Sequence, residues 1–364
     1  MKVLVISNMY PTEKNKSFGI FVKNQVEALR SRGLLVDVAA ITNPKAGKLQ
    51  VIKKYLLWML EVLKIFSIRG KKYSIVHAHY VFPSGLWGYF FKKIFGTRFI
   101  VTAHGGDIDK MARKSPFLFK WTKKILHEAD HIIAVGNELY DTIVNEFEVS
   151  GQKVSIINMG VNREVFKPLN KKIAKKTCGL DEDIKPILFV GNIIKQKGLI
   201  ELCSAFSKLI VTEPSLRLYL IGPQKDQNFA GELNQYLQAH HIQQYVQFLG
   251  VKDQKEIAQW MSAAEIFVLP SHIEGFGLVA LEAMACGTPV VGTNVGGLKY
   301  LLADGAGEIV SAKDSEALYK AILYLIHNQD ERYSLIENGE KRAEENDQER
   351  MLDYVMDVYF PTGG

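Results

Sequence analysis

Short apolar runs alternate along this chain with longer segments of helical periodicity, and this alternation restricts the possible folds more than any other feature. The runs are continuously apolar, which is typical of strands buried on both faces of a parallel sheet. Six runs fall in each half: Val3–Ser7, Val36–Ile41, Ile75–His79, Phe99–Thr102, His131–Val135 and Val154–Ile157, then Ile187–Val190, Leu216–Ile221, Val246–Leu249, Ile266–Leu269, Val290–Gly292 and Glu308–Val310. Six strands in each half predict two doubly wound α/β domains.

The 364 residues are enough for two such domains. We expect the connection within Asn162–Lys185, where Pro168, a run of lysines and three acidic residues are typical of a surface segment. This places an N-terminal domain at residues 1–165 and a C-terminal domain at 166–342. Residues 341–360 predict one helix, and we expect the tail, about 343–364, to pack back on the N-terminal domain. A helix that packs only on its own domain is the alternative.

Cysteine content and the start of the chain suggest a compartment. Cys178, Cys203 and Cys286 are few, odd in number and far apart, which fits a reducing cytosol better than a disulfide framework. The chain begins directly with a strand pattern, so we expect no secretory signal. The longest apolar stretch, Tyr55–Phe66, is too short to span a bilayer. These features predict a cytoplasmic protein.

Charge is distributed unevenly between the halves. Residues 1–168 contain 26 Lys and Arg against 13 Asp and Glu, whereas residues 169–364 contain 19 against 26. A basic half suggests an anionic partner. No helix-turn-helix, RNP or zinc-finger pattern supports nucleic acid. The basic and aromatic segments Lys53–Phe66 and Lys110–Lys124 fit peripheral docking on an anionic membrane on the inner face of the plasma membrane, or else core helices with solvated basic faces.

The most informative segment is Pro270–Pro289. A strand ends at Leu269, a loop follows, and an alanine-rich helix begins near Leu278. Small residues let a ligand approach the backbone, and the first free amides of a helix favour anions, so this corner suits a diphosphate. Glu274 in the loop and Glu282 in the helix are suited to bind neutral hydroxyls at opposite ends of an elongated ligand, such as a sugar and a ribose.

The run from Glu274 to Glu282 resembles the E-x7-E motif of the family 4 retaining glycosyltransferases. Those enzymes have the GT-B fold, in which two Rossmann-like domains face each other across a cleft. The surrounding residues, E-G-F-G-L-V-A-L-E-A-M-A-C-G-T-P-V-V-G-T-N-V-G-G, match the family pattern closely. The resemblance implies that Glu274 binds donor-sugar hydroxyls and Glu282 the ribose. It also implies donor contacts from the segment Gly275, Phe276, Gly277, Leu278 and Val279.

A second segment follows another strand and is expected to bind the phosphates of the donor. Gly191–Gly198 resembles the family motif G-R-x-x-x-x-K-G, in which Arg and Lys bind the donor diphosphate. Lys197 matches the Lys, but Asn192 occupies the Arg position. Lys195 could partly replace that charge, or Asn192 could bond a phosphate oxygen. Tyr300 is a second departure, because relatives often carry Glu there, and both departures weaken the transfer of donor identity.

In the N-terminal half, His104-Gly-Gly-Asp107 resembles the family's H-G-x-D segment, where the His lies by the sugar. We expect His104 to be catalytic, and Asp107 either to orient His104 or to approach the acceptor hydroxyl. His77 and His79 are more typical of packing or supporting residues. Gly19, at the end of the polar loop after the first strand, is expected near the diphosphate, with a simple helix-entry turn as the alternative. Val251 is a further donor-binding candidate.

The residues and the resemblance together predict transfer of a sugar from a nucleoside diphosphate sugar, UDP- or GDP-linked, to a hydroxyl with retention. No nucleophile for double displacement is evident, so the resemblance implies same-face attack assisted by the departing diphosphate. His104, Lys197 and Glu274 are the expected catalytic residues. No cofactor and no metal is expected. Asp107–Asp109 and Asp181–Asp183 only superficially resemble the D-x-D metal motif, which belongs with the other glycosyltransferase fold, and the second pair lies in the expected connection.

The expected acceptor is a lipid-linked or growing surface polysaccharide of a bacterium. Two other functions remain open at this point. One is a nucleotide-sugar epimerase or hydrolase of the same fold. The other is a non-catalytic, nucleotide-binding partner subunit, which the Asn192 departure keeps open. A dinucleotide oxidoreductase is disfavoured, because no G-x-G-x-x-G follows the first strand.

Overall fold

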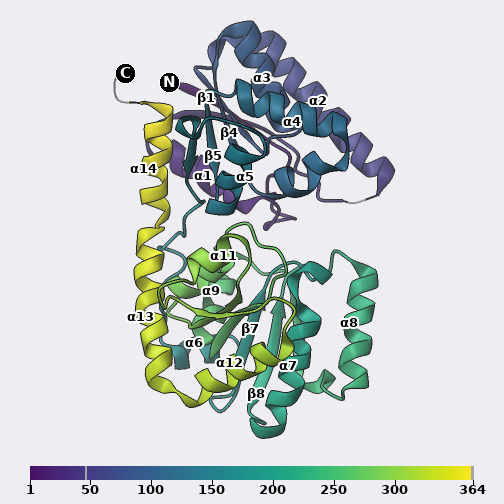
Figure 1. Ribbon diagram of the computed structural model, residues 1–364, viewed down its shortest axis with the longest axis vertical. Helices are drawn as coiled ribbons and strands as arrows, with labels where there is room; N and C mark the ends of the chain where they lie inside the picture. The colour runs from purple at the N-terminus through teal and green to yellow at the C-terminus, as the bar shows by residue number, and fades with distance from the viewer. Residues whose placement is uncertain (46, 362–364) are drawn as a thin grey trace. The chain divides into compact units, whose positions relative to one another are not determined.

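The computed structural model describes residues 1–45 and 47–361. The chain forms two compact units, one of Met1–Met159 with Glu349–Gly364 and the other of Gly160–Gln348 (Figure 1). Each unit contains a six-stranded sheet in which every strand pair is parallel. The expected class of two doubly wound α/β units is therefore confirmed. Residues 160–165, which we expected in the N-terminal domain, lie in the C-terminal unit.

The N-terminal unit has the strand order β2-β1-β3-β4-β5-β6. Its strands are β1 (Lys2–Ser7), β2 (Leu35–Ala40), β3 (Ile75–His79), β4 (Arg98–Ala103), β5 (His131–Ala134) and β6 (Val154–Ile156). Its helices are α1 (Ile20–Ser31), α2 (Lys48–Arg69), α3 (Ser84–Phe95), α4 (Pro116–Glu128), α5 (Asn137–Asn145) and α14 (Gln348–Tyr359). Side chains of the buried strands and the inner helix faces form three apolar clusters in this unit.

Close packing of α3 on the sheet requires glycine. A Cβ at Gly88 would lie 2.0 Å from Cε2 of Phe99, and one at Gly85 would lie 2.8 Å from Cγ2 of Ile125. The small residues in α3 therefore let its backbone approach β4 more closely than any side chain would allow. The Gly88 contact lies near the amino end of β4, and the Gly85 contact joins α3 to α4.

The end of the chain is two helices, so the expectation of one helix over 341–360 is wrong. α13 (Gln329–Glu345) ends before Asn346, and α14 begins at Gln348. The interruption has a partner: Val161 N–H donates to the Asn346 carbonyl at 2.9 Å, and Gln348 N–H donates to the Val161 carbonyl at 3.0 Å. The Asn346 carbonyl and the Gln348 N–H thus pair with Val161, in the segment that enters the C-terminal unit, and not within a helix.

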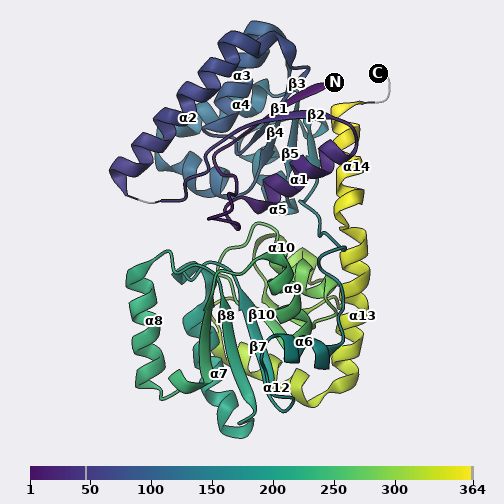
Figure 2. The ribbon, with the colours of Figure 1, turned by 180° about the vertical axis from the view of Figure 1, so that it is seen from behind.

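α14 packs on the N-terminal unit through an apolar face. Leu352, Val355 and Tyr359 are buried in the cluster that also contains α1 and strand residues. Tyr359 Oη lies 2.8 Å from His77 Nδ1, and Arg98 donates to the Val358 carbonyl at 2.9 Å. Figure 2 shows α14 running beside α1. The terminal helix therefore completes the core of the first unit.

The C-terminal unit has the strand order β12-β11-β10-β7-β8-β9 around one apolar core. Its strands are β7 (Lys185–Val190), β8 (Leu216–Ile221), β9 (Val246–Gly250), β10 (Ile266–Leu269), β11 (Val290–Thr293) and β12 (Glu308–Val310). Its helices are α6 (Lys171–Thr177), α7 (Leu199–Thr212), α8 (Gln227–Ala239), α9 (Gln254–Ala263), α10 (Leu278–Ala285), α11 (Gly296–Leu301), α12 (Ser315–His327) and α13.

The segment that we expected to be a surface connection contains α6. Asn170 caps this helix, because its side-chain oxygen accepts from the N–H groups of Lys172 and Ile173 at 3.1 and 3.2 Å. The run of lysines that suggested a linker is thus the exposed side of a short helix. Only Ala174 of this helix is buried.

We predict that Leu352→Ala destabilises the N-terminal unit by about 2–5 kcal/mol, because it leaves a cavity under α14. Tyr354→Ala, on the more exposed side of the same helix, is the control and should cost about 1 kcal/mol or less. Urea unfolding followed by tryptophan fluorescence measures both. Equal losses for the two variants would contradict the packing of α14 through its Leu352 face.

Candidate functional site

The candidate site of the C-terminal unit lies where the strand order reverses, between β10 and β7. Open parallel sheets bind ligands beyond the carboxyl ends of the strands at such a point. The loops that follow these two strands contact each other. His272 N–H donates to the Gln196 carbonyl at 2.8 Å, and a Cβ at Gly198 would lie 1.9 Å from the Pro270 carbonyl oxygen. The two segments singled out in the sequence are thus neighbours.

Lys197 and Glu274 form an ion pair at this point. Lys197 Nζ lies 2.6 Å from Glu274 Oε2, and the two side chains are 17% and 16% exposed. The Ser271 hydroxyl donates to the same carboxylate oxygen at 3.2 Å. A charge-assisted hydrogen bond that is mostly shielded from water is strong. The structure therefore brings together a cation suited to phosphate and a carboxylate suited to hydroxyls.

Glycines shape the loop that carries Glu274, Gly275 and Phe276. Gly277 has φ +92°, a left-handed conformation that side chains disfavour. Opposite it, Cβ atoms at Gly296 and Gly297 would lie 1.7 Å from the Glu274 carbonyl oxygen and 2.3 Å from the Gly275 carbonyl oxygen. The start of α11 thus packs directly on the backbone of the loop. This contact requires glycine at both positions and fixes the position of the loop.

The helix that follows the loop begins without a cap. Aspartate side chains cap α8, α9 and α12, whereas α10 begins after Gly277 with no side-chain cap. The N–H groups of Leu278 and Val279 have no acceptor among residues 1–45 and 47–361. Such groups, together with the positive end of the helix dipole, attract anions. α7, after Gly198, also begins without a side-chain cap.

Glu282 lies one turn into α10 and is nearly buried. Burial raises the pKa of its carboxyl group to about 8. No ion pair or hydrogen bond to that carboxyl group occurs within the part of the chain that the structure describes. A buried carboxyl group without a partner is costly unless a ligand supplies hydrogen bonds. This environment favours a binding role for Glu282.

The remaining candidates of this unit lie at the same carboxyl edge of the sheet or in α11. Asn192 follows β7, is partly exposed, and its side chain makes no hydrogen bond with the described residues. Val251 is half exposed after the edge strand β9, so β8 separates it from β7. Tyr300 lies in α11, with Lys299 Nζ 4.7 Å from its ring centre. None of the three contacts the Lys197–Glu274 pair by a hydrogen bond.

The candidate site of the N-terminal unit lies at the carboxyl ends of β3 and β4. His104 follows β4, and its Nε2 lies 3.1 Å from Nδ1 of His79, the last residue of β3. The rings of Phe21 and Tyr80 lie 4.9 and 4.6 Å from the His104 ring. Burial lowers the pKa of His104 to about 3, with a smaller contribution from His77. His104 is therefore a neutral imidazole near pH 7.

Asp107 holds the backbone beside His104. Its Oδ2 accepts from Val81 N–H at 2.7 Å and its Oδ1 from His104 N–H at 3.1 Å. Burial raises its pKa to about 6 even though these bonds favour the ionised form. Because both oxygens are used and the residue is buried, the geometry favours the orienting role over contact with an acceptor.

His77 and His79 lie in the interior, as expected for packing residues. His77 bonds Tyr359 and Thr102 at 2.8 and 2.7 Å and stacks on His79. His79 Nε2 is buried and has no partner among the described residues. The contact from His79 to His104 was not expected, although both residues stand at the ends of adjacent strands. That adjacency was the available signal.

Backbone conformation and close packing both favour glycine at position 19. It precedes α1 with φ +76°, and a Cβ there would lie 2.8 Å from the Met9 carbonyl carbon. Met9 in turn accepts a hydrogen bond from the Tyr80 hydroxyl at its Sδ, at 3.3 Å. The helix-entry alternative thus has direct support, and a contact of Gly19 with a diphosphate stays a prediction.

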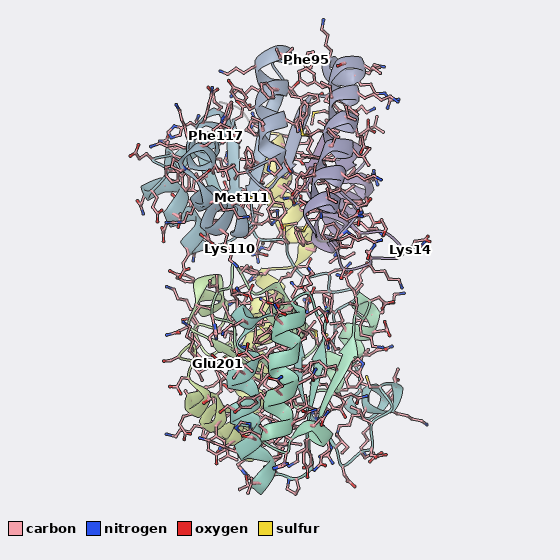
Figure 3. The ribbon with its side chains drawn as sticks, turned by 90° about the vertical axis from the view of Figure 1, so that its right-hand side faces the viewer. Lys14, Phe95, Lys110, Met111, Phe117 and Glu201 are labelled. Carbon is pink, nitrogen blue, oxygen red and sulfur yellow. The ribbon has the colours of Figure 1, made fainter. Side chains whose placement is uncertain are left out.

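Two supporting interactions of the C-terminal site were missed in the sequence. Ser271 bonds Glu274, and its carbonyl accepts from the Thr293 hydroxyl at 2.6 Å. His272 Nε2 lies 2.9 Å from Glu201 Oε1. Glu201, which is labelled in Figure 3, lies in the first turn of α7. Ser271 and His272 follow Pro270, the first residue after β10. Their place at the carboxyl end of a strand could have identified them.

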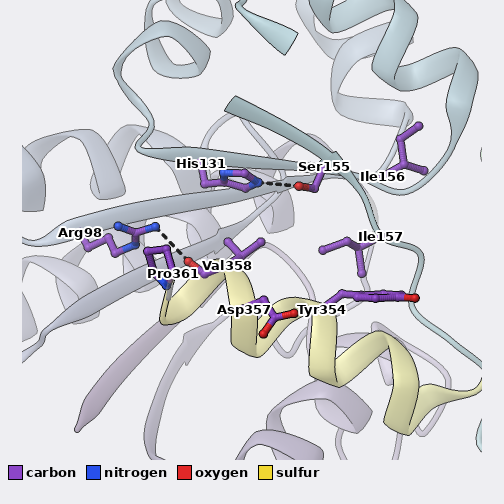
Figure 4. Close-up of a pocket in the computed structure, with 9 residues that line it drawn as sticks. All are labelled: Arg98, His131, Ser155, Ile156, Ile157, Tyr354, Asp357, Val358 and Pro361. Carbon is purple, nitrogen blue, oxygen red and sulfur yellow. Dashed lines mark hydrogen bonds between the residues drawn. The ribbon is translucent and has the colours of Figure 1, made fainter. Parts of the chain in front are cut away.

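A pocket elsewhere in the N-terminal unit is not part of this arrangement. It is lined by residues that begin β4 and β5, by β6 and by α14: Arg98, His131, Ser155, Ile156, Ile157, Tyr354, Asp357, Val358 and Pro361 (Figure 4). The starts of parallel strands lie at the edge opposite to their carboxyl ends. This pocket is therefore remote from His104 within the same unit.

Within residues 1–45 and 47–361, no three His, Cys, Asp or Glu side chains form a group suited to hold a metal ion. Independence of metal stays a prediction.

We predict that the N-terminal unit loses stability as the pH falls from 7 to 5. The folded unit keeps His77, His79 and His104 neutral, because burial lowers their pKa values, whereas unfolded histidines take up protons below about pH 6.5. The raised pKa of Asp107 acts in the opposite direction between about pH 6 and 4, but it is one group against three.

Urea midpoints at pH 7 and pH 5 measure this effect. His104→Gln should weaken the dependence, and His240→Gln, an exposed residue of the other unit, should not. A stability that is independent of pH in the wild type would contradict neutral buried histidines.

Comparison with protein families assigns both halves of the chain. Residues 19–165 match the model described as Glycosyltransferase Family 4, and residues 170–342 match the model described as Glycosyl transferases group 1. Together the two matches contain all the candidate residues of both units.

Individual relatives agree with this assignment. An uncharacterized glycosyltransferase from Methanocaldococcus jannaschii is 30% identical over 80% of this chain and 76% of its own length. D-inositol 3-phosphate glycosyltransferase 2 from Catenulispora acidiphila is 32% identical over 75% of this chain, which spans 66% of that relative, just under two thirds. The Bacillus subtilis protein TuaC, named for teichuronic acid biosynthesis, is 25% identical over 90% of both chains.

Solved structures show the same fold. A sucrose-phosphate synthase from Thermosynechococcus elongatus matches 99% of this chain and 98% of its own with a TM-score of 0.83 and 24% identity. Anabaena HepE in complex with UDP-glucose matches 100% of both chains with a TM-score of 0.82 and 19% identity. The fold is therefore GT-B, and the chain belongs to the family 4 glycosyltransferases.

Proposed function

We propose that this protein transfers a sugar, with retention, from a nucleoside diphosphate sugar to a hydroxyl acceptor. The observation that carries the proposal is the Lys197–Glu274 ion pair beside the uncapped start of α10, at the point where the strand order of the sheet reverses. Cation, free amides and carboxylate meet there, as a charged diphosphate joined to a polyhydroxylated sugar requires.

The donor occupies this corner from its phosphates outward. The N–H groups of Leu278 and Val279 and the Lys197 ammonium bind the diphosphate, and Glu274 accepts hydrogen bonds from sugar hydroxyls. Glu282, which is buried and has no partner among the described residues, accepts from the ribose. HepE, which shares the fold, was solved with UDP-glucose, and this supports a UDP-linked donor, with a GDP-linked donor as the alternative.

Binding of the donor changes the Lys197–Glu274 pair. Lys197 gains phosphate oxygens as partners, and the carboxylate of Glu274 turns its acceptors to hydroxyls. Because Ser271 also bonds Glu274, the carboxylate stays oriented while its ion pair is shared. Lys197 then contacts the diphosphate and Glu274 contacts the sugar, on either side of the bond that breaks.

Charge develops on the diphosphate as the bond to the sugar breaks. Lys197 and the amides of α10 are fixed before the reaction, so they stabilise this charge without reorganisation. The same-face mechanism, implied by the family, gives the acceptor proton to the departing diphosphate. No metal is proposed for this step, and turnover should persist in a chelator.

His104 is proposed to contribute a neutral hydrogen-bonding group to the reacting sugar. One proton lies between His79 Nδ1 and His104 Nε2, which are 3.1 Å apart. If His104 donated it, neutral His79 would carry its own proton on the buried, unpartnered Nε2. An unsatisfied buried N–H is costly and rare, so His79 donates. His104 then carries its proton on Nδ1, and His79 acts as the positioning residue that sets this tautomer.

The proposed acceptor is a lipid-linked or growing surface polysaccharide, with the protein peripheral on the inner face of the plasma membrane. The name of TuaC, which aligns with this chain over 90% of both lengths, and the basic N-terminal half support this class.

Asn192 is the one observation that favours another function. An amide replaces the cation of the family motif, so a subunit that binds nucleotide without transferring sugar is the second candidate. Turnover of a UDP- or GDP-sugar by the purified protein would eliminate it. Analysis of the product formed from donor alone separates transfer from epimerisation and hydrolysis.

We predict that Lys197→Ala lowers turnover on the order of 10²–10³-fold, by analogy with the loss of one preorganised donor to developing charge. Lys172→Ala is the control, because Lys172 is exposed in α6, outside both loops of the site, and its ion pair with Glu182 at 3.7 Å is exposed as well. Initial rates with excess donor and acceptor measure both. Unchanged turnover of Lys197→Ala would refute the assigned role.

We predict that His79→Leu lowers kcat on the order of 10- to 100-fold, the usual cost of losing a residue that orients a functional group. His79→Asn places an amide N–H near the position of Nδ1 and should keep most of the rate. Donor affinity should change little in either variant. The ¹⁵N spectrum of His104 should show the Nδ1–H tautomer in the wild type, and an Nε2–H signal there would contradict the assignment.

A further inference from the structure

The outer face of α2 exposes a continuous row of large apolar side chains. Six of them are between 47% and 83% exposed: Leu49, Ile52, Leu56, Met59, Leu60 and Leu63. Figures 1 and 2 show α2 at the outer edge of the N-terminal unit, beside α3. Scattered exposed apolar residues are common, but a contiguous patch marks a surface that something covers.

The spacing shows that these residues share one face. They follow one another at intervals of three, four, three, one and three residues, which places them on one side of a helix with 3.6 residues per turn. The inward face is different. Trp58 and Val62 are buried in the cluster with Phe91 of α3, and Trp58 Nε1 donates to the Ala39 carbonyl at 3.1 Å. α2 is therefore apolar on two sides, and the unit covers only one of them.

Basic residues border the exposed row. Lys53 and Lys64 are exposed on α2, and Lys71 and Lys72 are exposed directly after it. None of these four lysines forms an ion pair with another residue in the described parts of the chain. Glu61 is the one acidic residue of the helix. The surface is thus apolar and cationic together.

Two other helices of this unit also expose large apolar side chains. Ile94 at the end of α3 is 64% exposed, and Phe117 at the start of α4 is also 64% exposed. Phe117 stands at the surface in Figure 3. No helix among the described residues is long and apolar enough to cross a bilayer.

We propose that the outer face of α2 lies in the surface of an anionic bilayer, with the helix parallel to the membrane plane. An in-plane helix buries an apolar face among the acyl chains while lysines reach the headgroups. A second copy fits less well, because a two-fold interface places the same patch on both sides and would oppose lysines to lysines. The inference rests on the proposed function in one respect: a lipid-linked acceptor gives this surface a purpose.

Vesicle flotation tests the proposal with the full chain. Vesicles of phosphatidylcholine mixed with phosphatidylglycerol should bind the protein, and vesicles of phosphatidylcholine alone should bind it weakly. The triple variant Ile52→Gln, Leu56→Gln and Leu60→Gln should lose on the order of 100-fold in vesicle affinity, because three apolar side chains no longer enter hydrocarbon. All three positions are exposed, so the fold should be kept.

A matched control replaces three apolar residues elsewhere that are at least as exposed: Leu35→Gln, Ile173→Gln and Val211→Gln. It should float like the wild type. The set Lys53→Gln, Lys64→Gln, Lys71→Gln and Lys72→Gln should lose the preference for phosphatidylglycerol, because each lysine near an anionic surface contributes about 1 kcal/mol, which is about fivefold in affinity.

The outcomes that overturn the proposal are distinct. Equal flotation of the α2 triple variant and its control would refute membrane binding through the outer face of α2. A wild-type dimer that the α2 triple dissociates, seen by light scattering, would assign the face to a second copy. UDP-glucose binding measured without vesicles separates this inference from the proposed function. Loss of flotation with intact donor binding is expected for the α2 triple, whereas a wild type that floats but binds no nucleotide sugar would sink the proposed function alone.

Discussion

The geometry of the C-terminal unit depends on the reversal of strand order between β10 and β7. After β7 and β10 the chain continues to opposite faces of the sheet. The loops that follow these two adjacent strands therefore have no helix between them. Lys197 comes from one loop and Glu274 from the other, and their 2.6 Å ion pair joins segments 77 residues apart. Every proposed role in this unit follows from that junction, since it places the cation, the carboxylate and the start of α10 together.

Glycine and capping determine what the junction can bind. α8, α9 and α12 begin with aspartate caps, whose side chains accept hydrogen bonds from N–H groups of the first turn. α7 and α10 begin instead after left-handed glycines and leave their first amides without a side-chain cap. Gly296 and Gly297 pack against the backbone of the loop that carries Glu274, at distances that no side chain allows. In the N-terminal unit, burial determines protonation. It keeps His104 neutral and disfavours the His79 tautomer that carries its proton on Nε2.

Periodicity predicted the strands well because buried parallel strands are continuously apolar, and each expected run overlaps a strand of the sheet. It failed where pairing between distant segments decides structure. The polar tail predicts one helix, but hydrogen bonds from Val161 end α13 at Glu345. The site motifs predict Lys197 and Glu274 as binding residues, and that role stays a prediction. Their direct ion pair, the Ser271 bond and the contact of His79 with His104 depend on which strands are adjacent. The exposure of the outer α2 face was equally inaccessible, because an amphipathic pattern does not show which face the core covers.

Hydrogen–deuterium exchange with UDP-glucose and with GDP-mannose can locate the donor on the chain. One of these donors should slow exchange in residues 191–198 and in residues 274–285, where the amides of Leu278 and Val279 have no acceptor among the described residues. Slowing should be absent from α8 and α12, whose first turns are capped. Protection by a nucleotide sugar that spares both segments would contradict the assignment of the donor to the junction of β7 and β10.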